Sequence, residues 1–275
     1  MAPGRPATWR PALAGAGALY LVTPMSPDFP AHLVGDLMGE AARAGVTRVV
    51  LLSGLSAGYG SVPMLSREEP VRAADVEWTV LRPGAFSQNF SAGPHRSAVR
   101  EGVLRMPLGP DVRSAYIDVQ DIARTAVTVL TGDPGRAGDG RPGAPDHSGR
   151  IYDLAGPEAL SFPDVCARIA DATGRELRYE EVGSGEWEAR QRAAGVPDAA
   201  LARSLETFEA LRRGAYAGLH DGVQRVTGQA PRAFAAAARE AAARGDWDGV
   251  TGPRGEARTG GGRRDRGRRV CGLAH

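Results

Sequence analysis

The chain has 275 residues, of which 42% are hydrophobic and 24% charged, and its formal net charge is +2. A chain of this length can bury a core in one large or two modest domains. Its near-neutral charge predicts no specific nucleic-acid partner and no membrane partner. All 34 basic residues are arginine, so chemistry that needs a lysine, as general acid, Schiff base or phosphate ligand, is excluded.

The cysteines and histidines follow no recognisable metal-binding or disulfide pattern. Cys166 lies in an apolar helical pattern and Cys271 lies near the end of the sequence. The five histidines are scattered, so we predict no metal site. Free cysteines fit a reducing compartment, and we expect a cytoplasmic protein. No apolar run reaches transmembrane length, and the first residues lack the apolar core of a signal peptide.

The first elements predict a βαβ unit. Residues 18–23 form an apolar run typical of a strand, residues 30–44 have a helical apolar stripe, and residues 46–53 form a second strand. Short links between them predict parallel strands with a right-handed crossover. A glycine-rich loop is expected over 54–63 and a short helix over 66–74, with Ser66 and Glu69 at capping-box spacing and Pro70 shortening it.

The next stretch, residues 77–90, predicts the centre of the sheet. Its unbroken run from Trp78 to Leu81 is typical of a strand buried on both faces. Pro83 and Gly84 then end the strand, and a loop of mixed apolar and amide side chains follows. Ligands of open α/β sheets bind beyond the carboxyl ends of the strands, so a site is expected here. A plain buried strand followed by a turn is the alternative.

The second half predicts short strands and several helices. Short extended pieces are expected over 102–107 and 115–119, then a helix through Leu130 with Asp121 as its N-cap. Residues 132–149 have turn composition and predict a flexible loop. A strand over 151–154 precedes a helix opened by a capping box of Ser161 and Asp164 and ended by Gly174. A strand over 177–182 and helical periodicity over 186–244 follow.

Residues beyond 246 are rich in glycine and arginine, and a disordered tail is expected over 246–275. The arginine run in this tail could contact nucleic acid, but a solvated tail is the favoured interpretation.

Two common signatures of dinucleotide enzymes are absent from the sequence. Gly-x-Gly-x-x-Gly between a strand and a helix would hold a pyrophosphate, but no glycine cluster here has that context. Tyr-x-x-x-Lys would supply a proton, but no lysine is available, and Tyr59 is followed four residues later by Pro63. The catalytic residue is therefore left unassigned, with Tyr59 and Ser53 as weak candidates. Ser53 could hydrogen-bond a ligand carbonyl or simply close a strand.

Several segments nevertheless match one family in its own order. They are ALAGAGALYLVTPMSPD, AARAGVTRVVLLSGLSA, VEWTVLRPGAFSQNF, YIDVQDIARTAVTVL, IYDLAGPEALSFPDVCARIADATGRELRYEEV and VQRVTGQAPRAFAAAARE. Together they resemble the NmrA-like, atypical short-chain dehydrogenase/reductase group of NAD(P)-binding Rossmann proteins. The resemblance implies an α/β fold with a Rossmann-type parallel sheet and a smaller, helix-rich C-terminal substrate region.

The resemblance also implies positions for the site. The residues expected to bind the cofactor, NADP or NAD, are Thr23, Pro24, Ser53, Gly54, Pro83, Gly84 and Phe86. Gln88 and Asn89 are expected towards the substrate pocket. The expected domains are a partial NAD(P)-binding domain over 12–131 and a C-terminal substrate region over 150–245.

The start of the sequence departs from the family pattern. Family members begin with a strand, a glycine-rich loop and a helix, whereas the match here begins near Ala12. We therefore expect an N-terminally truncated Rossmann domain whose cofactor contacts could be lost with the glycine-rich loop.

Three functional hypotheses remain open from the sequence. The leading one is an NAD(P)H-dependent oxidoreductase that transfers hydride to a small quinone or carbonyl substrate. The second is a non-catalytic NAD(P)-sensing regulator that binds a protein partner. The third is a truncated relative that binds no cofactor, so whether the chain is an enzyme stays undecided at this point.

Overall fold

A central parallel sheet organises the fold of the computed structural model, which describes residues 6–24, 29–132 and 147–248. Its strands are β1 (Ala18–Val22), β2 (Arg48–Leu52), β3 (Glu77–Pro83) and β6 (Arg150–Leu154), in the order β1-β2-β3-β6. In register, Val22 lies opposite Leu52, and Leu52 opposite Leu81. The carboxyl ends of β1, β2 and β3 therefore meet at one edge of the sheet.

The burial of the strands follows from their sequence. Val49, Val50 and Leu51 of β2 are fully buried, as expected for an inner strand covered on both faces. In β1 every second residue is exposed, with Tyr20 36% and Val22 49% exposed. The sheet is therefore covered on both faces at β2 and β3 but on one face at β1.

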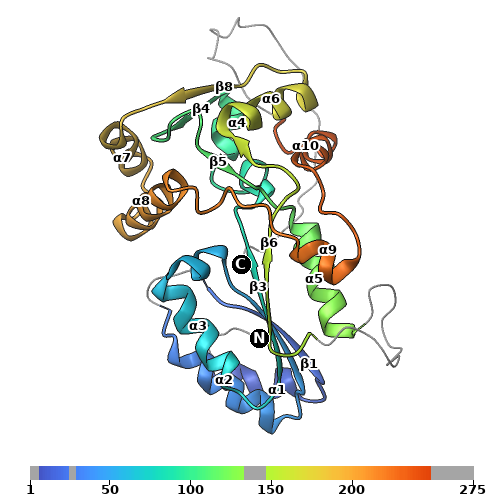
Figure 1. The fold of residues 1–275 in the computed structure, drawn as a ribbon. Helices are drawn as coiled ribbons and strands as arrows, with labels where there is room; N and C mark the ends of the chain where they lie inside the picture. Colours follow the sequence, from blue (N-terminus) through green and yellow to red (C-terminus); the bar gives the residue numbers. More distant parts are fainter. Residues whose placement is uncertain (1–5, 25–28, 133–146, 249–275) are drawn as a thin grey trace, which may run out of the picture.

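Helices from different parts of the chain cover the two faces (Figure 1). On one face, α1 (Trp9–Leu13) and α2 (His32–Arg43) pack a core with Val49, Leu51 and Val80, and α3 (Val62–Arg72) lies beside α2. On the other, α5 (Val119–Thr131) and α9 (Gly222–Thr227) pack against Val50 and Leu81. This alternation reproduces the two-residue period of a strand.

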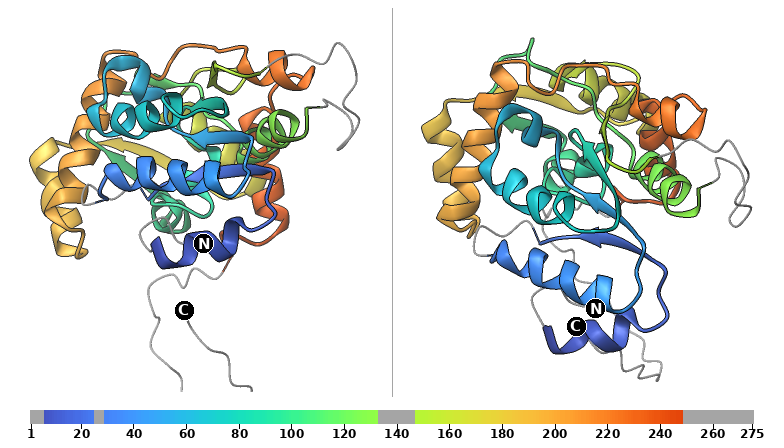
Figure 2. Two further views of the ribbon diagram at one scale, coloured as in Figure 1. Left: turned by 90° about the horizontal axis from the view of Figure 1, so that it is seen from below. Right: turned by 60° about the horizontal axis from the view of Figure 1, so that its bottom comes forward.

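A second layer lies beyond the carboxyl ends of the strands (Figures 1 and 2). It contains α4 (Arg96–Glu101), α6 (Phe162–Thr173), α7 (Ser184–Ala193), α8 (Asp198–Arg212) and α10 (Phe234–Ala243). Two small sheets join it: β4 (Val103–Met106) with β8 (Arg178–Glu181), and β5 (Arg113–Ser114) with β7 (Leu160–Ser161). Phe90, Phe162 and Phe234 lie at its core, where their rings make edge contacts.

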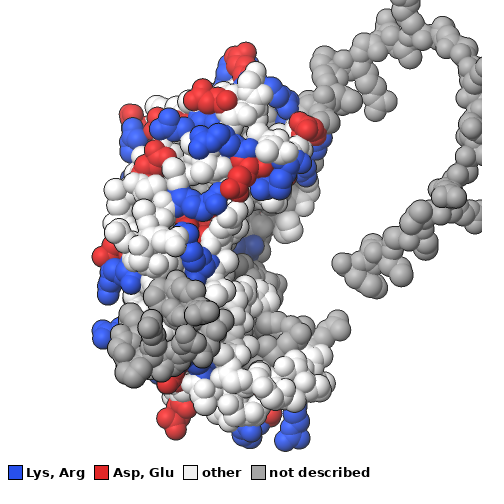
Figure 3. Space-filling view, turned by 90° about the vertical axis from the view of Figure 1, so that its right-hand side faces the viewer, with Lys and Arg blue, Asp and Glu red and all other residues white. Residues whose placement is uncertain are grey.

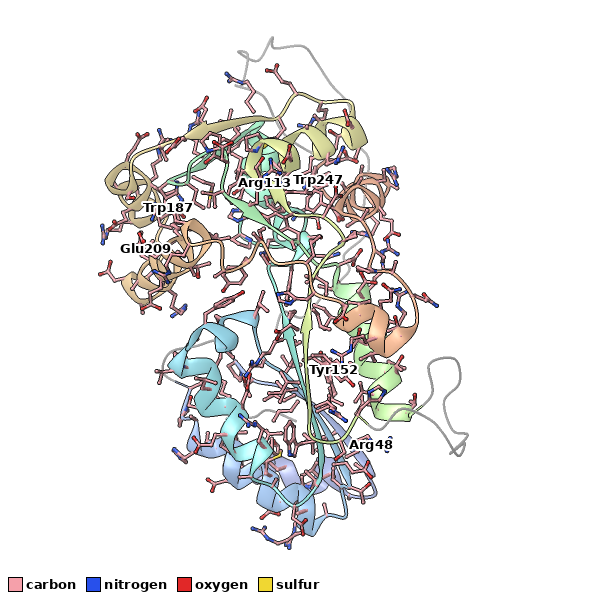
Figure 4. All side chains as sticks on the ribbon, in the orientation of Figure 1. Arg48, Arg113, Tyr152, Trp187, Glu209 and Trp247 are labelled. Atoms are coloured by element: carbon pink, nitrogen blue, oxygen red, sulfur yellow. The ribbon has the colours of Figure 1, made fainter. Side chains whose placement is uncertain are left out.

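The two layers exchange segments of the chain. Strand β6 lies beyond residue 150 yet pairs with β3 in the central sheet, and Tyr152 on β6 packs between the sheet and α9 (Figure 4). Conversely, β4 and β5 precede residue 131 but pair with strands of the second layer. The segments before and after the predicted boundary near residues 131–150 therefore each contribute strands to both layers.

The expected helix over 66–74 is longer than the sequence suggested. Helix α3 begins at Val62, with Ser61 before it and Pro63 in its first turn, where a missing N–H costs no hydrogen bond. Part of the loop expected over 54–63 is therefore helical, because residues Leu55–Tyr59 form a 3-10 helix. Ser66 lies inside α3, where its hydroxyl donates to the Pro63 carbonyl at 3.2 Å, so it is no cap. Pro70 lies in the last turn and does not break the helix before Arg72.

The predicted cap of α5 is also corrected. Asp118, three residues before the expected Asp121, is the N-cap, and its Oδ1 accepts from the Gln120 backbone N–H at 2.9 Å. Asp121 instead lies in the first turn, where its carboxylate accepts from the Arg232 backbone N–H at 2.7 Å. Two aspartates three residues apart both have capping character, and Asp118 takes this role because its backbone is extended.

Other local predictions are confirmed. The capping box of Ser161 and Asp164 opens α6, and Gly174 ends it with a left-handed backbone. The helical periodicity after 186 corresponds to α7, α8, α9 and α10. Residues 133–146 of the expected loop and 249–275 of the expected tail lie outside the described residues. Trp247, at the start of the expected tail, is among the described residues. It is buried, and its indole N–H donates to the Phe90 carbonyl at 2.7 Å.

Candidate active site

A cavity of about 410 Å³ lies where the central sheet meets α8. Its floor is made by the residues that end β1, β2 and β3, and its far wall by α8 and the segment that follows α8. The lining residues are Val22, Thr23, Leu52, Ser53, Gly54, Leu55, Ser56, Met64, Pro83, Gly84, Ala85, Phe86, Asn89, Thr207, Leu211 and Tyr216. The cavity is therefore largely apolar with a few polar groups, as is usual for sites that bind small molecules.

A buried ion pair lies beneath the floor and fixes Ser53. The Arg82 guanidinium donates to both oxygens of Glu68, at 2.8 and 2.6 Å, and the Ser53 hydroxyl donates to Glu68 Oε1 at 2.6 Å. The hydrogen bonds that Arg82 donates to Glu68 raise the pKa of Arg82 above its usual value. Because its proton is given to Glu68, Ser53 turns only its lone pairs towards a ligand.

Tyr216 forms the far wall and carries the most acidic of the lining groups. Its backbone carbonyl accepts from the Ala115 N–H at 2.8 Å, which ties this segment to the chain beyond β5. Burial raises the pKa of the Tyr216 phenol, and a hydrogen bond with Ser56, another lining residue, lowers it by less. The phenol is therefore protonated at neutral pH and can act as a donor.

Seven of the residues predicted from the sequence come together in this cavity. They are Thr23, Ser53, Gly54, Pro83, Gly84, Phe86 and Asn89. Pro24 is outside the lining, and its carbonyl accepts from the Arg67 guanidinium at 3.2 Å. Tyr59 ends a 3-10 helix, is 55% exposed and is also outside the lining.

The Gln88 amide is hydrogen-bonded to the start of α5. Its amide nitrogen donates to Asp118 Oδ1 at 2.9 Å, and its amide oxygen accepts from the Val119 backbone N–H at 3.1 Å. Both ends of the amide therefore brace the start of α5, and Gln88 does not line the cavity.

Sequence reasoning missed the far wall. Thr207, Leu211 and Tyr216 lie more than a hundred residues after the strand ends that they face. The sequence marked this region as helical and broken at Gly214, which gave no sign that Tyr216 faces the cavity. Only the fold brings these residues together.

The described part of the chain holds no group of histidine, cysteine, aspartate and glutamate side chains that could bind a metal ion. Within the same residues, no helix is long and apolar enough to cross a membrane. On the face drawn in Figure 3, arginine and acidic side chains are interspersed over the second layer, at the top of the picture, and charges of one sign do not gather there.

A parallel sheet with crossover helices on both faces, and a cavity beyond its carboxyl ends, defines a Rossmann-like α/β protein. No protein-family model matches the chain. It is 33% identical over 245 residues to an NAD(P)H azoreductase of Xenophilus azovorans, covering 86% of this chain and 80% of that protein. The chain therefore belongs to the NmrA-like family of NAD(P)-binding oxidoreductases.

Solved structures agree with this fold. A Citrobacter triphenylmethane reductase complexed with NADP(H) has a TM-score of 0.70 at 18% identity, covering 88% of this chain and 82% of that one. An NADPH-dependent quinone oxidoreductase of Escherichia coli complexed with NADPH also has 0.70, at 21% identity, covering 87% and 81%. NmrA, a negative transcriptional regulator solved with NAD, has 0.62 at 18% identity, covering 87% and 80%.

The cavity suits the nicotinamide end of such a cofactor. Apolar walls from Leu52, Met64 and Phe86 can hold a flat ring, and Gly54 and Gly84 leave the backbone open to it. A Cβ added at Gly54 would lie 3.4 Å from Met64 Sδ, so a larger side chain there would reduce the space. The lone pairs of Ser53 can accept from a carboxamide NH₂.

Proposed function

We propose that this protein is an NAD(P)H-dependent reductase that transfers hydride to a small quinone, carbonyl or azo acceptor. The observation that carries the proposal is the largely apolar cavity at the carboxyl ends of β1, β2 and β3, which is lined by six residues expected at the cofactor site and by Asn89, expected towards the substrate. The azoreductase and quinone oxidoreductase among the similar proteins support these classes of acceptor.

In this proposal, NADPH or NADH binds with its nicotinamide against Thr23, Ser53, Gly54, Pro83, Gly84 and Phe86. When bound, the nicotinamide supplies a hydride, and the protein supplies orientation and a site that excludes water. Ser53, held by Glu68 and Arg82, accepts from the carboxamide. Asn89 and the wall from α8 are left to contact the acceptor.

The pyrophosphate of the cofactor needs contacts beyond the cavity that suits the nicotinamide. The sequence contains no Gly-x-Gly-x-x-Gly turn between a strand and a helix, so those contacts have no assigned residues. The binding of cofactor by this chain is therefore the measurement to make first.

The experiment measures NADPH and NADH binding by calorimetry, followed by cofactor oxidation with a panel of quinones, aldehydes and azo dyes. We expect binding with turnover, and weaker binding by Gly54→Val than by Leu219→Ala, a matched change of an exposed residue outside the cavity. Binding without turnover would instead favour a cofactor-sensing regulator with a protein partner. A folded chain that binds neither cofactor would contradict the proposal.

A further inference from the structure

The reduction of a carbonyl or azo group needs a proton as well as a hydride, and the cavity must supply it or admit water. Among the described residues that line the cavity, Tyr216 is the single one with a titratable side chain. The other polar lining groups are serine and threonine hydroxyls and the Asn89 amide, which are far weaker acids than a phenol.

The hydroxyls of Ser53 and Thr207 are also engaged elsewhere. Ser53 gives its proton to Glu68 at 2.6 Å, and the Thr207 hydroxyl donates to the Arg203 carbonyl at 2.9 Å. A hydrogen bond with Ser56 lowers the pKa of the Tyr216 phenol by less than burial raises it. Tyr216 is therefore the lining residue with the most acidic proton to offer a ligand in the cavity.

We propose that Tyr216 is the proton donor of this reductase, with Ser56 as the residue that orients its hydroxyl. The inference rests on the proposed function. For a carbonyl acceptor, hydride adds to carbon, the π electrons move to oxygen, and the Tyr216 O–H proton passes to that oxygen. For an azo acceptor, hydride adds to one nitrogen and the proton to the other. In both cases the cofactor loses two electrons, the acceptor gains them, and the tyrosinate regains a proton from water.

The environment of Tyr216 is consistent with this role. Burial keeps the phenol in its protonated form at neutral pH, so it is loaded before the acceptor enters. An alkoxide or a hydrazine anion is a much stronger base than a phenolate, so the proton transfer runs downhill. The Ser56 hydrogen bond stabilises the phenolate that remains after the transfer.

The test compares two acceptors in wild type and Tyr216→Phe. An azo dye needs hydride and a proton, whereas a cationic triphenylmethane dye takes hydride at carbon and needs no proton. We expect Tyr216→Phe to lower kcat on the azo dye by about 100-fold or more, a usual loss for a general acid. Reduction of the cationic dye and the Kd for NADPH should stay within about twofold of wild type. Tyr20→Phe, which removes a hydroxyl outside the cavity lining, should leave both reactions unchanged.

A second readout needs no cofactor. In protein labelled with ¹³Cζ-tyrosine, the NMR resonance lost in Tyr216→Phe should titrate above the usual pKa range of tyrosine, and Ser56→Ala should raise its pKa further.

The outcomes separate the two proposals. If wild type binds cofactor but reduces no acceptor, the proposed function fails and the proton donor fails with it. If wild type is active and Tyr216→Phe reduces both dyes like wild type, only the assignment of Tyr216 is overturned. Equal losses on both dyes would also overturn it, because they would mark Tyr216 as a structural residue.

Discussion

The ion pair beneath the cavity gives the sharpest prediction of stability. The Glu68 side chain is 1% exposed and accepts three hydrogen bonds, two from Arg82 and one from Ser53. The Arg82 side chain is 13% exposed. Glu68→Gln keeps the shape of the side chain, removes its charge and sets an amide NH₂ against the donors of the guanidinium.

The expected cost follows from the charge that is left unpaired. Removing one partner of a buried ion pair costs about 3–5 kcal/mol. Arg82 keeps some access to water, and the Asp153 carboxylate also favours its charged form, so we expect a value near the lower end, about 3 kcal/mol. For a chain of this size, that loss corresponds to a fall in Tm of about 6–12 °C.

Urea unfolding at pH 7, followed by tryptophan fluorescence, measures the loss. The control is the double variant Glu68→Leu with Arg82→Met, which replaces both charges by apolar groups. We expect it to lose less stability than Glu68→Gln, because no unpaired charge remains. Solvent-exposed ion pairs contribute at most about 1 kcal/mol to stability. A loss below about 1 kcal/mol for Glu68→Gln would therefore refute the view that the Glu68–Arg82 pair is effectively buried.

Three further changes test other parts of the structure. Burial lowers the pKa of His95 from 6.5 to about 4, so the unfolded state takes up a proton first as the pH falls, and stability is lost between those values. His95 keeps part of its surface accessible, so we expect a loss of about 2 kcal/mol, absent in His95→Phe, from unfolding curves at pH 7 and 4.5. Gly222→Ala places a Cβ 2.3 Å from the Asp153 carbonyl oxygen, so α9 must move away from β6, and we expect a loss of stability of about 1–3 kcal/mol. The control is Gly185→Ala, in open space on α7, which should stabilise the protein by up to about 1 kcal/mol. Equal effects of the two changes in calorimetry would contradict the close approach of Gly222 to Asp153. Ser161→Ala removes a capping box and should cost about 1 kcal/mol in the same assay, and an unchanged Tm would show that the cap is dispensable.

The elements that could be predicted are those determined by residues close together in the sequence. Strands β1, β2, β3 and β6 and the cap of α6 follow from apolar runs and short motifs in which all of the information is local. The errors at α3 and α5 arose where two local signals competed. Ser66 and Glu69 have capping spacing, but the start at Ser61 and Pro63 prevails, because it lets a longer helix pack against α2.

The candidate site was predictable on one side alone. The residues that end parallel strands must meet at one edge of the sheet, so Thr23, Ser53 and Pro83 could be grouped from the sequence. The wall from α8 and Tyr216 depends on how the second layer settles on the sheet, which periodicity does not encode. For Gln88, the sequence suggested a place towards the substrate, whereas in the fold its amide hydrogen-bonds Asp118 and the Val119 backbone N–H.

The outer edge of β1 has unpaired amides, which affects hydrogen exchange. Within the described sheet β1 pairs with β2 alone, so every second amide of β1 points away from its neighbour. Those amides should exchange quickly, and the alternate ones should report the local opening of β1 from β2. Thr23 directly follows β1 and lines the cavity, so a ligand that contacts Thr23 should slow the exchange of the whole strand. Exchange along residues 18–22 would then report ligand occupancy without any label in the site.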